Sequence, residues 1–177
     1  RLWDPASGKE IRTLIGGGED RKREQRSLTS ADFTADSRNV VTGSFDKTAV
    51  LWDVATGKRL LVLRGHDQAV TRVKASPDGR LIATASADKT ARLWDAATGQ
   101  EMVALRGHTA EIYWLAFSPD SRTLATASAD RTARLWPTEA PKLAELVSEA
   151  CRRLLRVGQR IDSCRDLTPL SEAHAQR

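Results

Sequence analysis

Most of the chain is a succession of short stretches in which hydrophobic and polar residues are interleaved, each ended by a turn signal. In one unit, residues 69–75 mix apolar and polar positions, residues 81–86 are small and apolar, residues 90–94 alternate, and residues 101–105 form a fourth stretch. Turn-forming residues separate them, as in Ser76-Pro77-Asp78-Gly79, where Pro sets φ and Gly accepts a positive φ. Short alternating stretches predict β-strands, and therefore an all-β fold of antiparallel strands.

A repeat of about 42 residues organises these stretches. Four tryptophans that each follow a leucine are spaced by 49, 42 and 42 residues: Trp3, Trp52, Trp94 and Trp136. Residues 76–94 match residues 118–136 at 15 of 19 positions, which indicates duplication rather than chance. One four-stranded sheet cannot bury both of its faces alone, so such units are expected to stack as sheets around an axis.

Two dipeptides recur in this register. Gly65-His66 is followed by Trp94-Asp95, and Gly107-His108 by Trp136, with 28 residues from His to Trp in both cases. Over residues 1–136 the chain thus resembles the WD-repeat β-propeller family. The resemblance implies a propeller segment of about three four-stranded blades. Three departures stand out: Pro137 follows Trp136, Gly16-Gly17-Gly18 replaces the first Gly-His, and seven extra residues lie between residues 14 and 29.

The expected blades are a partial blade at 1–15, full blades at 27–63 and 69–105, and three strands at 111–136. Strand 9–15 is one candidate to complete the last blade. Since closed propellers have about 4–8 blades, we expect a segment of a longer propeller, with ring closure by two chains and an open arc as alternatives. The start at Arg1, without a methionine, favours the segment.

The expected C-terminal tail, residues 137–177, has a different period. Apolar residues between Pro141 and Gly158 recur at helical spacing and predict an amphipathic α-helix: Leu143, Leu146, Val147, Ala150, Cys151, Leu154 and Leu155. Residues 149–154 and 167–169 resemble the C-terminal tail of large bacterial WD-repeat proteins, many of which carry a kinase, caspase-like or nucleotide-binding module upstream. The resemblance implies that this chain is the scaffold or sensor end of such a protein, in contact with its other domains.

Composition narrows the classes of function. With 40% hydrophobic and 29% charged residues the chain is globular, and no apolar run approaches the roughly 20 residues that a bilayer requires. Two cysteines, Cys151 and Cys164, cannot build a disulfide framework, so a cytoplasmic location is expected. No metal site is indicated and no cofactor is expected.

One set of residues imitates a catalytic triad. His66, Ser86, Asp88 and Trp94 are expected to converge, and His, Ser and Asp together suggest a hydrolase. The resemblance instead implies a structural hydrogen-bond network, with Thr84 on the same strand face as the alternative to Ser86. The same set recurs as His108, Ser128, Asp130 and Trp136, while the first full blade has Ser44, Asp46 and Trp52 without a His. A repeated set in successive blades favours the structural interpretation.

Partner contacts are expected on one rim of the blades. The residue that opens each first strand is Thr29, Thr71 or Tyr113, and the residue before each turn aspartate is Phe45, Ala87 or Ala129. The resemblance places contacts with a protein or peptide at these positions. Phe45 and Tyr113 offer apolar surface, and Glu111 adds a charge. Phe45 could alternatively fold over its neighbours as a plug. The predicted function is a non-catalytic protein-interaction scaffold or sensor.

Nucleic acid is the rival ligand. The net charge is +5 and residues 21–26 form a basic loop, but Glu19, Asp20 and Glu24 interrupt it, which is typical of a solvated loop. Binding to a membrane surface is not expected, because the polar face of the tail helix carries charges of both signs.

Overall fold

The computed structural model describes residues 1–14 and 27–139. Contacts divide the chain into one compact unit, Arg1–Thr138, and a second, Glu139–Arg177; the strands all belong to the first. The predicted basic loop 21–26 and the predicted C-terminal helix lie outside the described residues. Within the described ranges, no helix has the length and apolar character needed to span a membrane.

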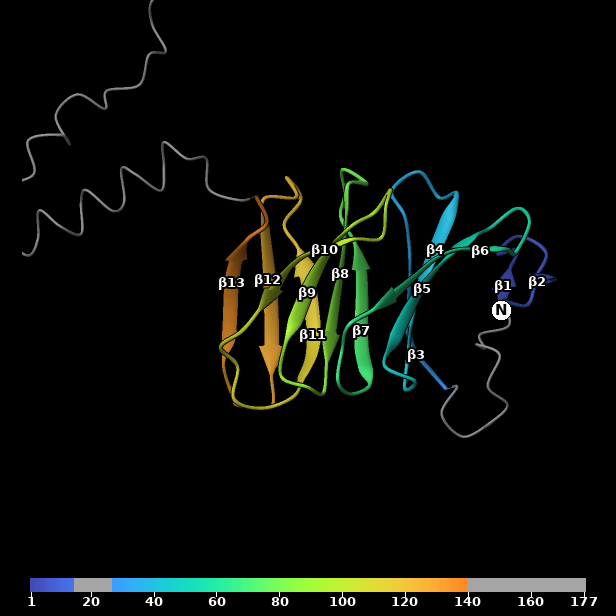
Figure 1. The fold of residues 1–177 in the computed structure, drawn as a ribbon. Helices are drawn as coiled ribbons and strands as arrows, with labels where there is room; N and C mark the ends of the chain where they lie inside the picture. Colours follow the sequence, from blue (N-terminus) through green and yellow to red (C-terminus); the bar gives the residue numbers. More distant parts are fainter. Residues whose placement is uncertain (15–26, 140–177) are drawn as a thin grey trace, which may run out of the picture. The chain divides into compact units, whose positions relative to one another are not determined.

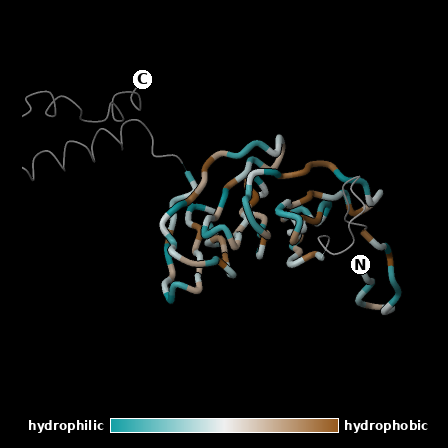
Figure 2. The backbone as a smooth tube through the Cα atoms, turned by 60° about the horizontal axis from the view of Figure 1, so that its bottom comes forward, coloured by the Kyte–Doolittle hydropathy of each residue, from teal (hydrophilic) through white to brown (hydrophobic). Residues whose placement is uncertain are grey.

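The strands are short and follow one another in chain order. Their bounds are β1 (Leu2–Trp3), β2 (Glu10–Arg12), β3 (Leu28–Phe33), β4 (Asn39–Ser44), β5 (Thr48–Asp53), β6 (Arg59–Arg64), β7 (Val70–Ala75), β8 (Leu81–Ser86), β9 (Ala91–Asp95), β10 (Glu101–Leu105), β11 (Ile112–Phe117), β12 (Thr123–Ser128) and β13 (Ala133–Pro137). Hydrophobic and hydrophilic stretches alternate along the backbone, without a long apolar run (Figure 2).

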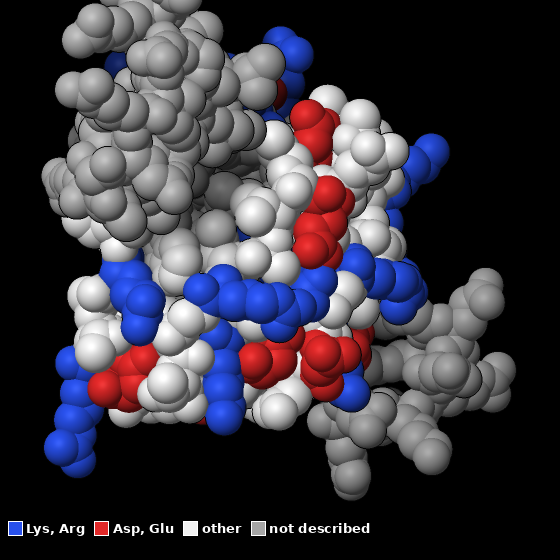
Figure 3. All heavy atoms as spheres, turned by 60° about the vertical axis from the view of Figure 1, so that its left-hand side comes forward, with Lys and Arg blue, Asp and Glu red and all other residues white. Residues whose placement is uncertain are grey.

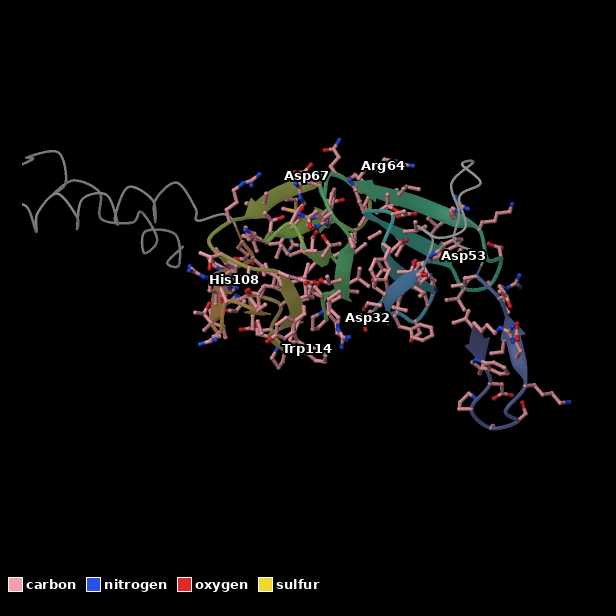
Figure 4. The ribbon with its side chains drawn as sticks, turned by 90° about the horizontal axis from the view of Figure 1, so that it is seen from below. Asp32, Asp53, Arg64, Asp67, His108 and Trp114 are labelled. Carbon is pink, nitrogen blue, oxygen red and sulfur yellow. The ribbon has the colours of Figure 1, made fainter. Side chains whose placement is uncertain are left out.

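Each strand pairs antiparallel with its neighbours in the sequence, which gives separate sheets that stand side by side (Figure 1). We call β1–β2 the half-blade, β3–β6 the first blade, β7–β10 the second blade and β11–β13 the third blade. Seen along the strands, β3, β7 and β11 lie on one side, and β6 and β10 lie on the other (Figure 4). The predicted all-β architecture of four-stranded antiparallel sheets is confirmed.

The turns form where the sequence predicts them, for local reasons. In the β7–β8 turn, the Ser76 hydroxyl donates to Asp78 Oδ1 at 2.5 Å, the same carboxylate accepts from the Arg80 amide at 3.1 Å, and Gly79 has a φ of 74°. The tighter β8–β9 turn places Lys89 at a φ of 71°, a left-handed conformation that costs a residue with a side chain about 1–2 kcal/mol. The carboxylate of the preceding Asp88 holds this turn by accepting from the Thr90 amide and hydroxyl at 2.9 and 2.6 Å.

The core lies between the blades. One apolar cluster joins the first and second blades: Val41, Ala49, Leu51, Leu63, Val70, Val73, Ile82 and Trp94. A second cluster joins the second and third blades: Ala83, Ala85, Ala91, Leu93, Leu105, Ile112, Leu115 and Leu124. The middle strands of the second blade are therefore buried on both faces, which explains why β8 is a continuous run of small and apolar residues.

The two ends of the unit differ. At the N-terminal end, Leu14 is buried in a cluster with Val40 and Trp52. The proposed completion of the third blade by strand 9–15 is not what the structure shows, because β2 pairs with β1 and Arg12 donates to the carbonyls of Ala55 and Thr56. At the other end, β13 pairs with β12 alone within the described residues, which contain three strands of the third blade.

Candidate functional site

A chain of buried hydrogen bonds crosses the second blade. The indole Nε1 of Trp94 donates to Thr84 Oγ1 at 2.9 Å, Thr84 Oγ1 lies 2.7 Å from His66 Nε2, and His66 Nδ1 lies 2.7 Å from Asp88 Oδ2. Thr84 is 0% exposed, and His66 and Trp94 are buried too. A neutral imidazole satisfies every bond when Nδ1 carries the proton toward Asp88 and the Thr84 hydroxyl donates to Nε2. The hydrogen bonds among these four side chains pair both His66 ring nitrogens and the Trp94 indole N–H, which offsets the cost of burying them.

The hydroxyl that joins His66 to Trp94 belongs to Thr84, and this corrects the expectation that Ser86 holds this place. Ser86 lies at the end of β8, where its Oγ donates to the Gln68 carbonyl at 3.2 Å and accepts from the Asp88 amide at 3.0 Å. It therefore supports the turn. Thr84 takes this place because it lies two residues further from the turn than Ser86, opposite Arg92 in the strand register. Its hydroxyl is therefore within hydrogen-bond distance of the Trp94 indole.

The third blade repeats this arrangement, with the same correction. His108 contacts Asp130 at 2.7 Å and Thr126 at 2.9 Å, and Trp136 donates to Thr126 at 2.9 Å. Ser128 instead donates to the Ala110 carbonyl at 3.0 Å. His108 lies within the third blade in Figure 4.

The first blade keeps part of the arrangement. Trp52 donates to Thr42 at 2.8 Å, and Asp46 accepts from the Thr48 amide at 3.0 Å. The sequence has no histidine before His66. Ser44 accepts from the Asp46 amide at 3.2 Å, so it too supports the turn and not the indole.

The environment sets the ionisation of these groups. Burial opposes the charge on Asp88, but hydrogen bonds from the Thr90 hydroxyl and the His66 ring outweigh it and lower the pKa of Asp88 to about 2. Burial lowers the pKa of His66 below 6.5, against the opposing effect of Asp88. The pKa of Asp130 is lowered as well, chiefly by the Thr132 hydroxyl. Asp88 is thus a carboxylate and His66 a neutral ring at pH 7.

This geometry does not assemble a catalytic triad from the predicted residues. The partners of His66 are Asp88 and Thr84, with Thr90 at 3.4 Å, whereas Ser86 bonds to main-chain groups. A nucleophile must reach both its base and a substrate, and Ser86 and Thr84 are each 0% exposed. In the second and third blades, the His, Asp and Trp of the predicted set, joined through a threonine, form a buried structural network. Within residues 1–14 and 27–139, no group of three or more metal-ligating side chains occurs.

The predicted rim positions of each blade lie together. The amide of Phe45 donates to the Ser27 carbonyl at 3.0 Å, and the equivalent bonds join Ala87 to Ala69 at 3.0 Å and Ala129 to Glu111 at 2.9 Å. We call these six positions, together with the predicted positions 29, 71 and 113, the rim: 27, 29, 45, 69, 71, 87, 111, 113 and 129. Phe45 is 56% exposed and Tyr113 is 53% exposed. More than half of the Phe45 side chain thus faces solvent, and it is not folded away as a plug.

Two of the predicted contact residues form hydrogen bonds to the neighbouring blade. The Thr29 hydroxyl donates to the Val70 carbonyl at 2.5 Å, and the Thr71 hydroxyl donates to the Ile112 carbonyl. Each bond ties the inner strand of one blade to the inner strand of the next. The hydroxyls of Thr29 and Thr71 are thus engaged within the blades, and their predicted contact with a partner stays a prediction.

The sequence matches the family described as WD domain, G-beta repeat, over residues 8–53, 57–95 and 99–137. Each matched stretch starts with the outer strand of one blade and continues through three strands of the next. The chain belongs to the WD40 family.

Solved WD40 structures have the same fold. The chain is similar to "Structure of U3-55K" and to "Crystal structure of RRP9 WD40 repeats", each at 25% sequence identity and a TM-score of 0.62. Both matches cover 67% of this chain, but only 38% and 37% of the respective neighbour. The chain thus spans well under half the length of these two propellers.

Side chains on the inner strands of this WD40 segment were missed by the sequence reasoning. The Arg72 guanidinium lies 3.8 Å from the ring centroid of Trp114, and Lys74 forms an ion pair with Asp32 at 2.8 Å. Asp32 and Trp114 lie on the inner-strand side of the blades (Figure 4). Positions 72 and 114 are one repeat apart, so the 42-residue register could have indicated the first pair.

Proposed function

We propose that this WD40 segment is a protein-interaction scaffold or sensor that binds an extended peptide or protein loop on the rim. The observation that carries the proposal is the exposure of Phe45 and Tyr113, at 56% and 53%, on segments next to the main-chain bonds Phe45–Ser27 and Ala129–Glu111. Exposed aromatic side chains on a rigid support are typical of interaction hot spots. Ala87, in the blade between them, leaves room for a ligand to reach both aromatic rings.

The proposal extends to the setting of the segment. We place it in the cytoplasm, as part of a large bacterial WD-repeat protein whose other domains lie beside it. The tail motif at residues 149–154 and 167–169 supports the large WD-repeat protein, and the lack of a disulfide framework is the basis for the cytoplasmic location.

The rival functions have less support on the described residues. Lys and Arg side chains are interspersed with Asp and Glu side chains on the face of Figure 3, and a surface that binds nucleic acid is expected to be dominated by positive charge. The basic loop 21–26 lies outside the described residues. Ser86 is 0% exposed, which argues against Ser86 as the nucleophile of a hydrolase.

A peptide-display selection against the whole chain tests the proposal. Selected peptides are measured against Phe45→Ala and Tyr113→Ala, and we expect at least one of the two variants to bind about tenfold more weakly, since truncating a hot spot costs more than about 1 kcal/mol. Phe33→Ala is the matched control, because Phe33 is 52% exposed at the opposite end of β3. Peptides that bind both rim variants as tightly as the wild type would refute binding on the rim.

A further inference from the structure

The turn between the second and third strands of each blade holds an exposed cation. We call the end of the blades that carries the rim the rim end, and these turns lie there, beside the rim positions 45, 87 and 129. Lys47, Lys89 and Arg131 occupy the turns one repeat apart, with φ values of 73°, 71° and 68°. Glycine adopts this left-handed conformation without strain, so a long charged side chain is an unfavourable choice for the backbone.

The opposite end of the blades differs at its own left-handed turn position. There the residues are Ser37, Gly79 and Ser121, with φ values of 58°, 74° and 61°. All three are small and uncharged. The same blades thus place small residues in one set of left-handed turns and cations in the other. Backbone geometry does not account for this difference, which indicates that the positive charge itself is used at the rim end.

A second cation stands beside the turn in both four-stranded blades. Arg64 ends β6, opposite the residue that follows Lys47 in the strand register. Arg106 directly follows β10 and holds the same place beside Lys89. Both arginines are exposed. Two cations therefore lie at the same corner of successive blades, although like charges repel each other.

Acidic side chains of the protein do not neutralise these cations. None of the lysines and arginines named above belongs to an ion pair within residues 1–14 and 27–139. The side chains of Asp88 and Asp130, which precede two of the turn cations, are 6% exposed and bonded to the buried histidines. Asp46 accepts two hydrogen bonds within its own turn. The exposed acids of this end, among the described residues, are Asp67 and Glu111.

Charges at the opposite end are balanced. Each exposed arginine of the turns between the first and second strands follows an exposed aspartate by two residues: Asp36 and Arg38, Asp78 and Arg80, Asp120 and Arg122. The excess of positive charge therefore belongs to the rim end, where the predicted partner contacts lie.

We propose that the partner of the rim is an acidic peptide segment, whose Asp or Glu side chains pair with the turn cations and with the arginines beside them. This inference rests on the proposed function, because it assigns the chemistry of the ligand for the same surface. Phe45 and Lys47 lie in one turn, so an apolar side chain and a carboxylate of the ligand can bind side by side. Arg64 lies on the side of the blades away from Asp32 and Trp114 (Figure 4), so the acidic residues extend toward the outer strands. Exposed, unpaired charges of this kind steer association and select the partner.

The charge pattern fits a peptide better than a nucleic acid. A nucleic acid carries a negative charge at every nucleotide, whereas Asp67 and Glu111 interrupt the cations of the rim end. A peptide can place carboxylates opposite the cations and neutral residues opposite these two acids. The aromatic side chains of the rim then bind the apolar residues of the same peptide.

A display selection of random dodecapeptides against the whole chain supplies the probes. We expect the selected peptides to be rich in Asp and Glu, and their affinity to fall as salt is raised from about 0.05 to about 0.3 M, because exposed charge pairs are screened. In fluorescence anisotropy, Lys89→Glu should bind the strongest of these peptides about tenfold more weakly, since it opposes like charges. Replacing the acidic residues of the peptide one at a time by lysine should yield a peptide that prefers Lys89→Glu. Lys58→Glu is the matched control, because Lys58 is an exposed lysine in the turn between β5 and β6 at the opposite end, and it should bind normally.

Lys89→Gly separates the charge from the backbone. It should weaken binding and yet raise the urea midpoint, because glycine relieves the left-handed turn, whereas a purely structural role would move both in the same direction. Selected peptides without enrichment in acidic residues would overturn the proposal, and so would equal binding by Lys89→Glu. Tighter binding of a single-stranded thymidine dodecamer than of the best peptide would overturn it in favour of nucleic acid.

The two proposals for the rim fail in different ways. Peptides that lose affinity with Phe45→Ala or Tyr113→Ala but not with Lys89→Glu would leave binding on the rim intact and refute the acidic ligand. Acidic peptides that depend on Lys89 but bind both aromatic variants normally would support the acidic ligand and refute the aromatic contacts.

Discussion

Replacing Thr84 by valine removes one hydroxyl and leaves the shape of the side chain almost unchanged. The hydroxyl lies 2.7 Å from His66 Nε2 and 2.9 Å from Trp94 Nε1, and all three residues are buried. The variant leaves two buried ring nitrogens, His66 Nε2 and Trp94 Nε1, without a hydrogen-bond partner. Each unpaired buried group costs about 1–3 kcal/mol, so we expect the free energy of unfolding to fall by about 2–6 kcal/mol.

The first blade supplies the matched control. Thr42 is also buried and accepts from the Trp52 indole at 2.8 Å. Because this blade has no histidine, Thr42→Val leaves only one ring nitrogen, Trp52 Nε1, without a partner. Its expected cost is about 1–3 kcal/mol. Thr84→Val should therefore be the more damaging of the two by about the cost of one hydrogen bond.

Urea unfolding at pH 7.5, followed by tryptophan fluorescence and by circular dichroism, measures both variants. Near-wild-type circular dichroism before unfolding shows that each variant still folds. Equal losses for Thr84→Val and Thr42→Val, or a loss of less than about 1 kcal/mol for Thr84→Val, would refute the idea that His66 depends on this hydroxyl. Ser86→Ala, which leaves the Thr84 hydroxyl in place to accept from Trp94 and to bond to His66, should not reproduce the difference.

Three more outcomes are expected. Folding lowers the pKa of His66 below 6.5 and that of Asp88 from 3.8 to about 2, so the unfolded chain binds more protons in acid than the folded chain. The free energy of unfolding should therefore be highest above about pH 6.5 and should fall as the pH drops to about 2. A urea midpoint that stays constant across this range would contradict this prediction. Leu93→Ala should lower the free energy of unfolding by about 2–5 kcal/mol and Leu135→Ala by less than about 0.5 kcal/mol, and similar losses would mean that the outer face of the third blade is covered. Lys89→Gly should raise the free energy of unfolding by up to about 1 kcal/mol, because Lys89 has a φ of 71°, a left-handed conformation that glycine adopts without strain. A loss of stability would argue against strain in this turn.

The strands and their order follow from local information. Period-two alternation and turn residues predicted β7 to β10 to within one residue at each end, because each strand pairs with its neighbour in the chain and few long-range contacts decide its limits. The repeat identified the blades for the same reason, since equivalent residues recur in equivalent places.

Side-chain partners were predicted less well, and Thr84 shows why. Thr84 and Ser86 lie on the same face of β8, and either hydroxyl suits the pattern. Which one meets the indole depends on the register between β8 and β9 and on the path of the loop that carries His66. A closer comparison of the repeats would have helped, since a threonine occupies positions 42, 84 and 126 alike.

At the rim, too, the sequence predicted the positions of the residues but not the partners of their side chains. Sequence register placed Thr29, Phe45 and Tyr113 at one end of the blades. It could not show which of these side chains faces solvent and which forms a hydrogen bond to the next blade. The Thr29 hydroxyl bonds to the next blade while Phe45 faces solvent, and only the spacing between inner strands decides this.

The amino-acid sequence by itself determined the all-β class, the blades and the residues that brace them, because strand pairing and turns are local and the repeat presents them several times. Tertiary structure alone decided which hydroxyl joins each His to its Trp, which threonines link neighbouring blades, and that Leu135 is exposed where the equivalent Leu93 is buried. Those outcomes depend on how one sheet faces another, and this is set by contacts between residues about 42 positions apart.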